Sequence, residues 1–81
     1  MHKSIDEIIS GVLKLSITEI TNDVMMKDTD AWDSLSHMSL ILALEEAYAI
    51  EFSMDEIVSM VSVLSIRENV KNKLDSNGNK K

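Results

Sequence analysis

Apolar residues recur every three or four positions near the start of the chain, and this spacing predicts an amphipathic helix. The positions are Ile5, Ile8, Ile9, Val12 and Leu13. Ser4 stands directly before them and is a suitable N-cap. The pattern predicts that this first helix ends near Lys14 or Leu15.

The helical periodicity fades between Ser16 and Asp33, where Ser, Thr, Asn and Asp accumulate. This composition predicts a long loop. We expect its apolar side chains to pin it to the core: Ile17, Ile20, Val24 and Trp32. A connection of this length is unusual in a small domain and is often functional.

The pattern predicts a second helix from Ser34 to about Ala49, with Asp33 as its N-cap. At about 100° per residue, it has two apolar faces. One consists of Leu40, Leu44, Ala47 and Tyr48, and the other of Leu35, Met38 and Leu42. One face must fill the core. The face with Leu35, Met38 and Leu42 lies closer to Ser34, and it is either covered by other elements or kept for partner contacts.

Two further helices are predicted after residue 53. Asp55 to Met60 forms a short third helix, because acidic residues occupy its first turn. The last helix begins near Ser62 or Ser65, and Ser65 with Glu68 matches a capping box. Either start gives the same buried face: Val63, Ile66, Val70 and Leu74.

With no proline, two glycines and no strand-like alternation, the chain is predicted to be all-α. Its 81 residues predict a single domain, 1–81, with an ordered core over about 4–75 and a polar tail over 76–81. No apolar run is long enough to span a membrane, and the N-terminus lacks a secretory signal. We therefore expect a cytoplasmic protein.

The formal net charge is −6, and the acids are unevenly placed. Between Asp28 and Ile66 there is no Lys or Arg. The acids in this stretch are Asp28, Asp30, Asp33, Glu45, Glu46, Glu51, Asp55 and Glu56. Such a distribution disfavours nucleic acid as a ligand and fits either a basic protein partner or a solvated acidic face.

The chain has no cysteine, so disulfides, thiolate metal sites and a cysteine nucleophile are excluded. Any thiol chemistry must come from a cofactor. Asp28, Asp30 and Asp33 do not form a calcium loop, because Trp32 and Ser39 occupy positions that require other residues. We predict no metal site.

The tripeptide Asp33-Ser34-Leu35 places a hydroxyl at the start of the second helix. A helix N-terminus stabilises an anion through its unpaired N–H groups and the macrodipole, so a phosphate attached to Ser34 would suit this position. Taken alone, the tripeptide also fits simple helix capping by Asp33.

The surrounding sequence resembles the acyl carrier proteins, whose Asp-Ser-Leu serine is esterified with phosphopantetheine. The resemblance covers roughly residues 5 to 74. It rests on the acidic loop, Asp33-Ser34-Leu35, Leu44-Glu45-Glu46, Tyr48, Ile50-Glu51-Phe52, the acidic third helix and Ser62-Val63. It implies a four-helix bundle with a long loop between helices one and two and a short third helix, and a carrier that is not an enzyme.

By this resemblance, Ser34 attacks the β-phosphate of coenzyme A and acquires a phosphopantetheine arm. Asp33 helps to present the serine or meets the metal of the transferase, and Leu35 contacts the transferase. The arm carries acyl groups as thioesters between enzymes of fatty-acid, polyketide or related biosynthesis. The resemblance implies a monomer whose partners, a phosphopantetheinyl transferase and acyl-transferring or condensing enzymes, have basic docking surfaces. The residues expected to meet them are Met38, Leu42, Glu45, Glu46, Asp55 and Glu56.

The chain departs from the common fatty-acid carriers at two places. Ser36, His37 and Ser39 are neutral where those carriers have acids, and Ala31-Trp32 replaces the usual glycine before the motif. We expect Trp32 to plug the core beneath the loop. His37 is expected to be a surface histidine, not a hydrolytic partner of Ser34.

Two alternatives remain from the sequence. One is a peptidyl or aminoacyl carrier, although these more often have a Gly-Gly-[His/Asp]-Ser site. The other is an unmodified acidic helical module that binds a protein through Met38, Leu42 and the acids.

Overall fold

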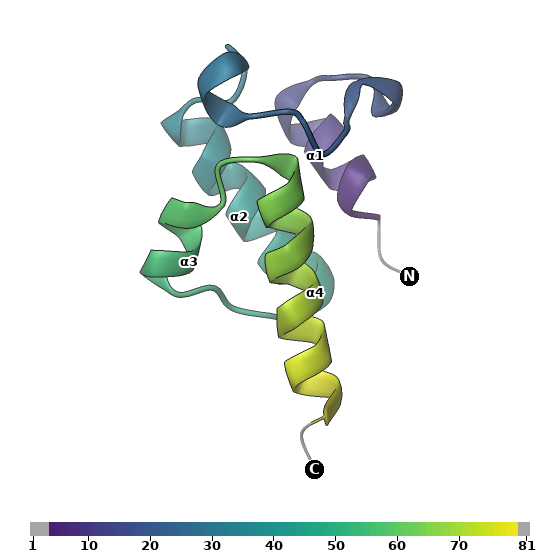
Figure 1. Cartoon of the computed structure of the whole chain (residues 1–81), viewed down its shortest axis with the longest axis vertical. Helices are drawn as coiled ribbons and strands as arrows, with labels where there is room; N and C mark the ends of the chain where they lie inside the picture. Colours follow the sequence, from purple (N-terminus) through teal and green to yellow (C-terminus); the bar gives the residue numbers. More distant parts are fainter. Residues whose placement is uncertain (1–3, 80–81) are drawn as a thin grey trace.

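The chain folds into four α-helices over the residues that the structure describes. The computed structural model describes the backbone of residues 4–79 and the side chains of residues 4–75. The helices are α1 (Ile5–Leu13), α2 (Ser34–Tyr48), α3 (Met54–Ser59) and α4 (Val63–Asn79), and two 3-10 turns, Ile17–Glu19 and Met26–Asp28, lie in the loop after α1 (Figure 1). The predicted order of helix, long loop, helix, short helix and helix is confirmed.

None of the helices within residues 4–79 is both long enough and apolar enough to cross a membrane.

Side-chain caps mark where the helices start. Ser4 and Glu7 form a capping box at α1, since Ser4 Oγ accepts from the Glu7 N–H and Glu7 Oε1 accepts from the Ser4 N–H. α1 ends at Leu13, and Lys14 adopts a left-handed C-cap with φ 60°. α3 lies one residue earlier than predicted, because Ser53 is its N-cap.

The start of α4 resolves the two predicted alternatives in favour of Ser62. Ser62 Oγ accepts a 3.1 Å hydrogen bond from the Ser65 N–H, and the Ser65 hydroxyl donates to the Ser62 carbonyl. The predicted capping box of Ser65 with Glu68 is therefore wrong. Helical backbone continues to Asn79, past the predicted boundary at residue 75, and residues 80–81 lie outside the described part.

The fully buried core residues come from α1, α2, α4 and the segments between the helices. α3 has no fully buried residue, but its half-buried Ile57 packs against the core. The buried members of the core are Ile8, Ile9, Leu13, Ile20, Trp32, Leu40, Ile41, Leu44, Ile50, Phe52, Met60, Val63, Ile66 and Val70. Two predicted core positions are wrong: Ile17 is 49% exposed and Leu74 is 39% exposed. Leu74 lies in the second half of α4, and the neighbouring elements cover its side chain only in part.

The long loop is held against the junction of α3 and α4. The Met26 N–H donates to the Val61 carbonyl at 2.8 Å, and the Val63 N–H donates to the Val24 carbonyl at 3.0 Å. These two bonds form an isolated antiparallel bridge. They fix the part of the loop that leads to Asp33 and Ser34.

The other half of the loop is held by one side chain of α4. The Arg67 guanidinium donates to Asp6 Oδ1 of α1 at 2.6 Å, to the Ile20 carbonyl at 3.4 Å, and to Asn22 Oδ1. Arg67 therefore connects α1, the loop and α4.

Candidate functional site

Ser34 is the first residue of α2, and its side chain is exposed. Asp33 before it has extended backbone angles and acts as N-cap, with Oδ1 accepting from the Ser36 N–H at 2.9 Å. That hydrogen bond, assisted by the Ser36 hydroxyl, lowers the pKa of the Asp33 carboxyl below its usual value. The ionised cap and the helix start thus fix the backbone that carries the Ser34 hydroxyl.

A buried anchor next to the motif directs Ser34 outward. Trp32 is 2% exposed, and its backbone N–H donates to the Thr29 carbonyl at 2.9 Å. Thr29 in turn donates through its hydroxyl to the Met25 carbonyl at 2.7 Å. The prediction that Trp32 plugs the core beneath the loop is confirmed, and the two residues that follow it are exposed.

His37 is buried, so the prediction of a surface histidine is wrong. Its exposed fraction is 7%. Trp32 Nε1 donates to His37 Nδ1 at 3.0 Å, and His37 Nε2 lies 2.8 Å from the Ile57 carbonyl oxygen. The periodicity of apolar residues along the sequence could not predict this arrangement, because it depends on the carbonyl of Ile57, which lies twenty residues further along the chain in α3.

Two open apolar grooves adjoin Ser34. One, of about 540 Å³, is lined by Met25, Met26, Lys27, Trp32, Asp33, Ser34 and Val61. The other, of about 300 Å³, lies between α2 and α3 and is lined by Met26, Ser34, His37, Met38, Met54, Ile57, Val58 and Val61. The grooves share Met26, Ser34 and Val61, so a group attached to Ser34 would have apolar surface on both sides.

The second apolar face of α2 is exposed, so the alternative in which other elements cover it is wrong. Leu35 is 82% exposed, Leu42 61% and Met38 45%. Neither α3 nor the loop covers these side chains fully. Met54 and Val58 of α3 are also mostly exposed, so the apolar surface near Ser34 extends over two helices. Isolated exposed hydrophobic residues are ordinary, but a group of them beside a candidate site indicates an interaction surface.

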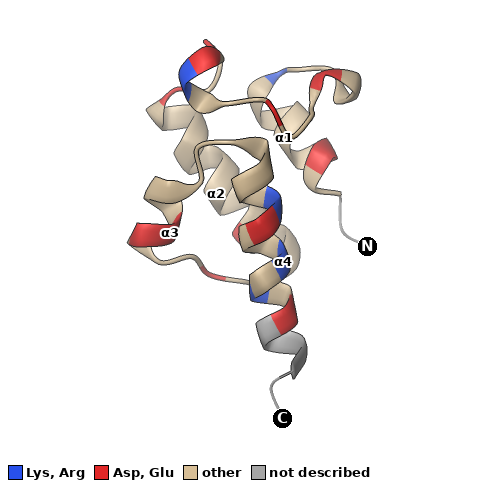
Figure 2. Cartoon of the chain, viewed as in Figure 1, with Lys and Arg blue, Asp and Glu red and all other residues tan. Residues whose placement is uncertain are grey.

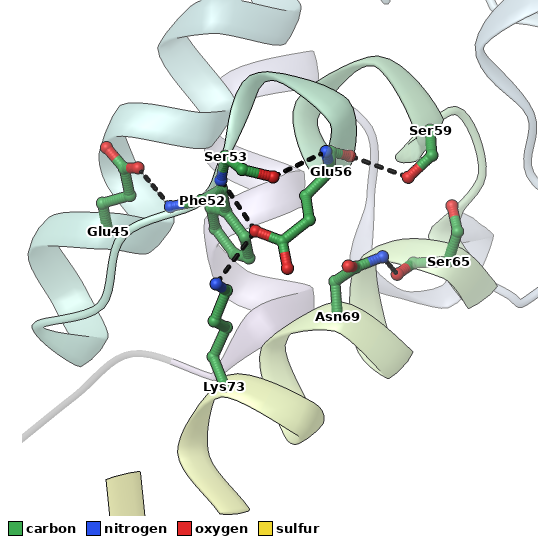
Figure 3. A network of polar contacts seen from close by, with 8 residues as sticks. All are labelled: Glu45, Phe52, Ser53, Glu56, Ser59, Ser65, Asn69 and Lys73. Carbon is green, nitrogen blue, oxygen red and sulfur yellow. Dashed lines mark hydrogen bonds and ion pairs between the residues drawn. The ribbon is translucent and has the colours of Figure 1, made fainter. Parts of the chain in front are cut away.

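The predicted acidic residues differ in how far they are free to meet a partner. Glu46 and Asp55 are exposed. Glu45 Oε2 accepts from the Phe52 N–H at 2.9 Å, and Glu56 Oε1 accepts from the Ser53 N–H at 2.7 Å (Figure 3). Glu45 and Glu56 therefore support the segment between α2 and α3 as well as adding negative charge.

Lys73 of α4 reaches the acidic surface although the sequence around α3 contains no cation. Its Nζ lies 2.9 Å from Glu56 Oε1 (Figure 3). The Ser53 N–H and then Lys73 lower the pKa of the Glu56 carboxyl. The remaining charge pattern is uneven: α3 and the segment before it carry acids, whereas the basic residues of the described part lie in the loop, at the end of α1 and on α4 (Figure 2).

Comparison with known proteins agrees with this geometry. Residues 3–68 match the model of the family described as "Phosphopantetheine attachment site". The acyl carrier protein of Buchnera aphidicola subsp. Schizaphis graminum is 32% identical over 73 residues, covering 90% of this chain and 92% of the relative. The acyl carrier protein of Buchnera aphidicola subsp. Baizongia pistaciae is 35% identical over 71 residues, covering 88% and 91%.

A solved structure shows the same fold. The solution structure of the holo acyl carrier protein from Geobacter metallireducens matches with a TM-score of 0.80 and 34% identity, covering 90% of this chain and 84% of that one. Members of the matched family carry substrates on a phosphopantetheine group and do not catalyse reactions themselves. The chain belongs to the acyl carrier protein family.

Proposed function

We propose that Ser34 is the residue that carries the phosphopantetheine arm. The observation that carries this proposal is the exposed hydroxyl at the first position of α2, held by the Asp33 cap and by the buried Trp32. A phosphodiester on Ser34 lies at the positive end of a fifteen-residue helix, where an anion is stabilised. The arm supplies the terminal thiol that this chain lacks.

The neighbouring residues have separate roles in this proposal. Asp33 keeps the first turn of α2 in place while the transferase acts on Ser34. Leu35, which is 82% exposed, offers the transferase an apolar contact directly beside the hydroxyl. Neither residue takes part in the reaction of the acyl group.

The docking surface extends along α2 and α3 from Ser34. Met38 and Leu42 supply apolar contacts, and Glu46 and Asp55 supply exposed negative charge. Glu45 and Glu56 add charge at the border, although both also accept backbone hydrogen bonds. Complementary charge favours enzymes with basic docking surfaces, and these belong to fatty-acid, polyketide or related acyl biosynthesis.

Intact mass tests the attachment. The protein is incubated with coenzyme A, magnesium and a broad-specificity phosphopantetheinyl transferase. We expect wild type to gain one phosphopantetheinyl unit and Ser34→Ala to gain none. Ser39→Ala is the matched control, because Ser39 is an exposed serine of the same helix.

The control should be modified as wild type is, and circular dichroism should show that both variants are folded. Modification of folded Ser34→Ala, or no gain by wild type with several transferases, would overturn the assignment.

A further inference from the structure

Trp32, His37 and Ile57 form a bridge between the segment before Ser34, the first turn of α2, and α3. The indole Nε1 can only donate, so His37 Nδ1 accepts, and the Nε2 proton is donated to the Ile57 carbonyl. The two bonds, of 3.0 and 2.8 Å, fix one neutral tautomer of the imidazole. Trp32 and His37 are both buried, with exposed fractions of 2% and 7%.

This bridge stands between Ser34 and the core. His37 is three residues after Ser34, so the two lie on neighbouring positions of the helix surface, and both line the groove between α2 and α3. Further along α2, the buried side follows from His37 to Leu40, Ile41 and Leu44, which are at most 1% exposed. A chain attached to Ser34 and moving inward between α2 and α3 therefore meets His37 first.

Opening the route past His37 into the core would break hydrogen bonds of buried groups. If His37 moves aside, the buried indole N–H of Trp32 loses its partner, and the Ile57 carbonyl keeps only the 3.3 Å hydrogen bond from the Met60 N–H. A buried donor without a partner destabilises the open form. Outside the bridge, the two grooves beside Ser34 already offer apolar surface. The closed form can thus hold an acyl group without any rearrangement of the core.

We propose that the Trp32–His37 bridge determines cargo specificity by closing the route that leads from the groove between α2 and α3 into the core. The acyl group then rests in the outer grooves lined by Met25, Met26, Met38 and Met54. These open grooves favour short acyl groups, because a long alkyl chain would leave much of its apolar surface in water. The inference rests on attachment of the arm at Ser34.

The test compares acetyl and octanoyl arms on wild type, on Trp32→Phe/His37→Ala, and on His37→Gln. Each protein is loaded from the matching acyl-coenzyme A, and intact mass confirms the loading. The thermal midpoint and the amide shifts of Leu40, Leu44 and Met60 are then measured. His37→Gln is the matched control, since its amide can accept from Trp32 and donate to Ile57 as the imidazole does.

We expect octanoyl wild type and octanoyl His37→Gln to resemble their acetyl forms in midpoint and in core amide shifts. In the double variant, octanoyl should raise the midpoint by about 4 °C over acetyl and shift the core amides, because the chain enters the opened core.

If the double variant does not fold, the core amide shifts of octanoyl and acetyl wild type still test whether the route into the core is closed. Core shifts caused by octanoyl in wild type would overturn the closure alone. Absence of added mass on every protein would overturn the attachment at Ser34, and the inference with it.

Discussion

Adjacent acids of α2 have different structural roles. Glu45 accepts a hydrogen bond from the Phe52 N–H and so holds the segment after α2, whereas Glu46 is exposed. Of the pair, Glu46 can meet a partner at no cost to the fold. A loss of partner binding after substitution of Glu45 would therefore combine a charge effect with a change in the position of α3.

Arg67 is the side chain that we expect to contribute most to fixing the loop. Arg67→Ala removes charge-assisted bonds to Asp6 and Asn22 and the bond to the Ile20 carbonyl. We expect it to lower the free energy of unfolding by about 1 to 2 kcal/mol, measured by urea denaturation. Lys71→Ala, an exposed cation on the same helix, is the control and should change stability by less than about 0.5 kcal/mol. Equal effects of the two substitutions would show that loss of positive charge, and not the loop contacts, is responsible.

At the scale of helices, local sequence predicts most of the boundaries. Ser4 with Glu7 and Asp33 before Ser34 are caps that act within three residues, so they can be identified without a structure. The exposed Ser34, the proposed attachment site, also follows from its place one residue after a cap. Interactions between elements could not be predicted in this way. His37 and Lys73 look solvent-facing in isolation, and their partners, Ile57 and Glu56, lie twenty and seventeen residues away along the chain.

The short helix α3 is held by contacts at its first turn. Six residues are too few for a stable isolated helix, so the capping box of Ser53 with Glu56 and the ion pair with Lys73 are important for its position. The Ser53 N–H and Lys73 lower the pKa of Glu56 in the folded state. The ionised carboxylate therefore stabilises the fold above the unfolded pKa of about 4.3, and this contribution is lost as the pH falls through the lower folded pKa.

Glu56→Gln tests this pH dependence, because glutamine keeps the capping geometry and loses the charge. At pH 7 we expect the variant to be less stable by a few tenths to about 1 kcal/mol. The difference from wild type should shrink in urea denaturation as the pH falls from about 5 to about 3. Glu51→Gln, which removes an exposed acid, is the control for net charge. A difference for Glu56→Gln that stays constant with pH would contradict a role for the ionised carboxylate.

For the whole domain, the net charge of −6 on 81 residues acts against the compact state. The two ion pairs in the described residues, Arg67–Asp6 and Lys73–Glu56, are both partly buried, so salt weakens them less than it weakens interactions between fully exposed charges. Repulsion among the acids of α2, α3 and the loop extends over many more residues. The same excess of negative charge that suits a basic partner therefore reduces the stability of the free carrier.

Screening should consequently stabilise the protein. Raising sodium chloride from about 0.02 M to about 0.5 M shortens the Debye length from roughly 20 Å to roughly 4 Å, which removes most of the repulsion between exposed acids. We expect the thermal midpoint, followed by circular dichroism, to rise by a few degrees, corresponding to about 1 kcal/mol. A neutral osmolyte at equal osmolarity is the control for effects of water activity. A midpoint that falls with salt would mean that the two ion pairs outweigh the repulsion. A carrier of this charge should also bind a basic enzyme more weakly in the same salt range, so stability and partner affinity should change in opposite directions.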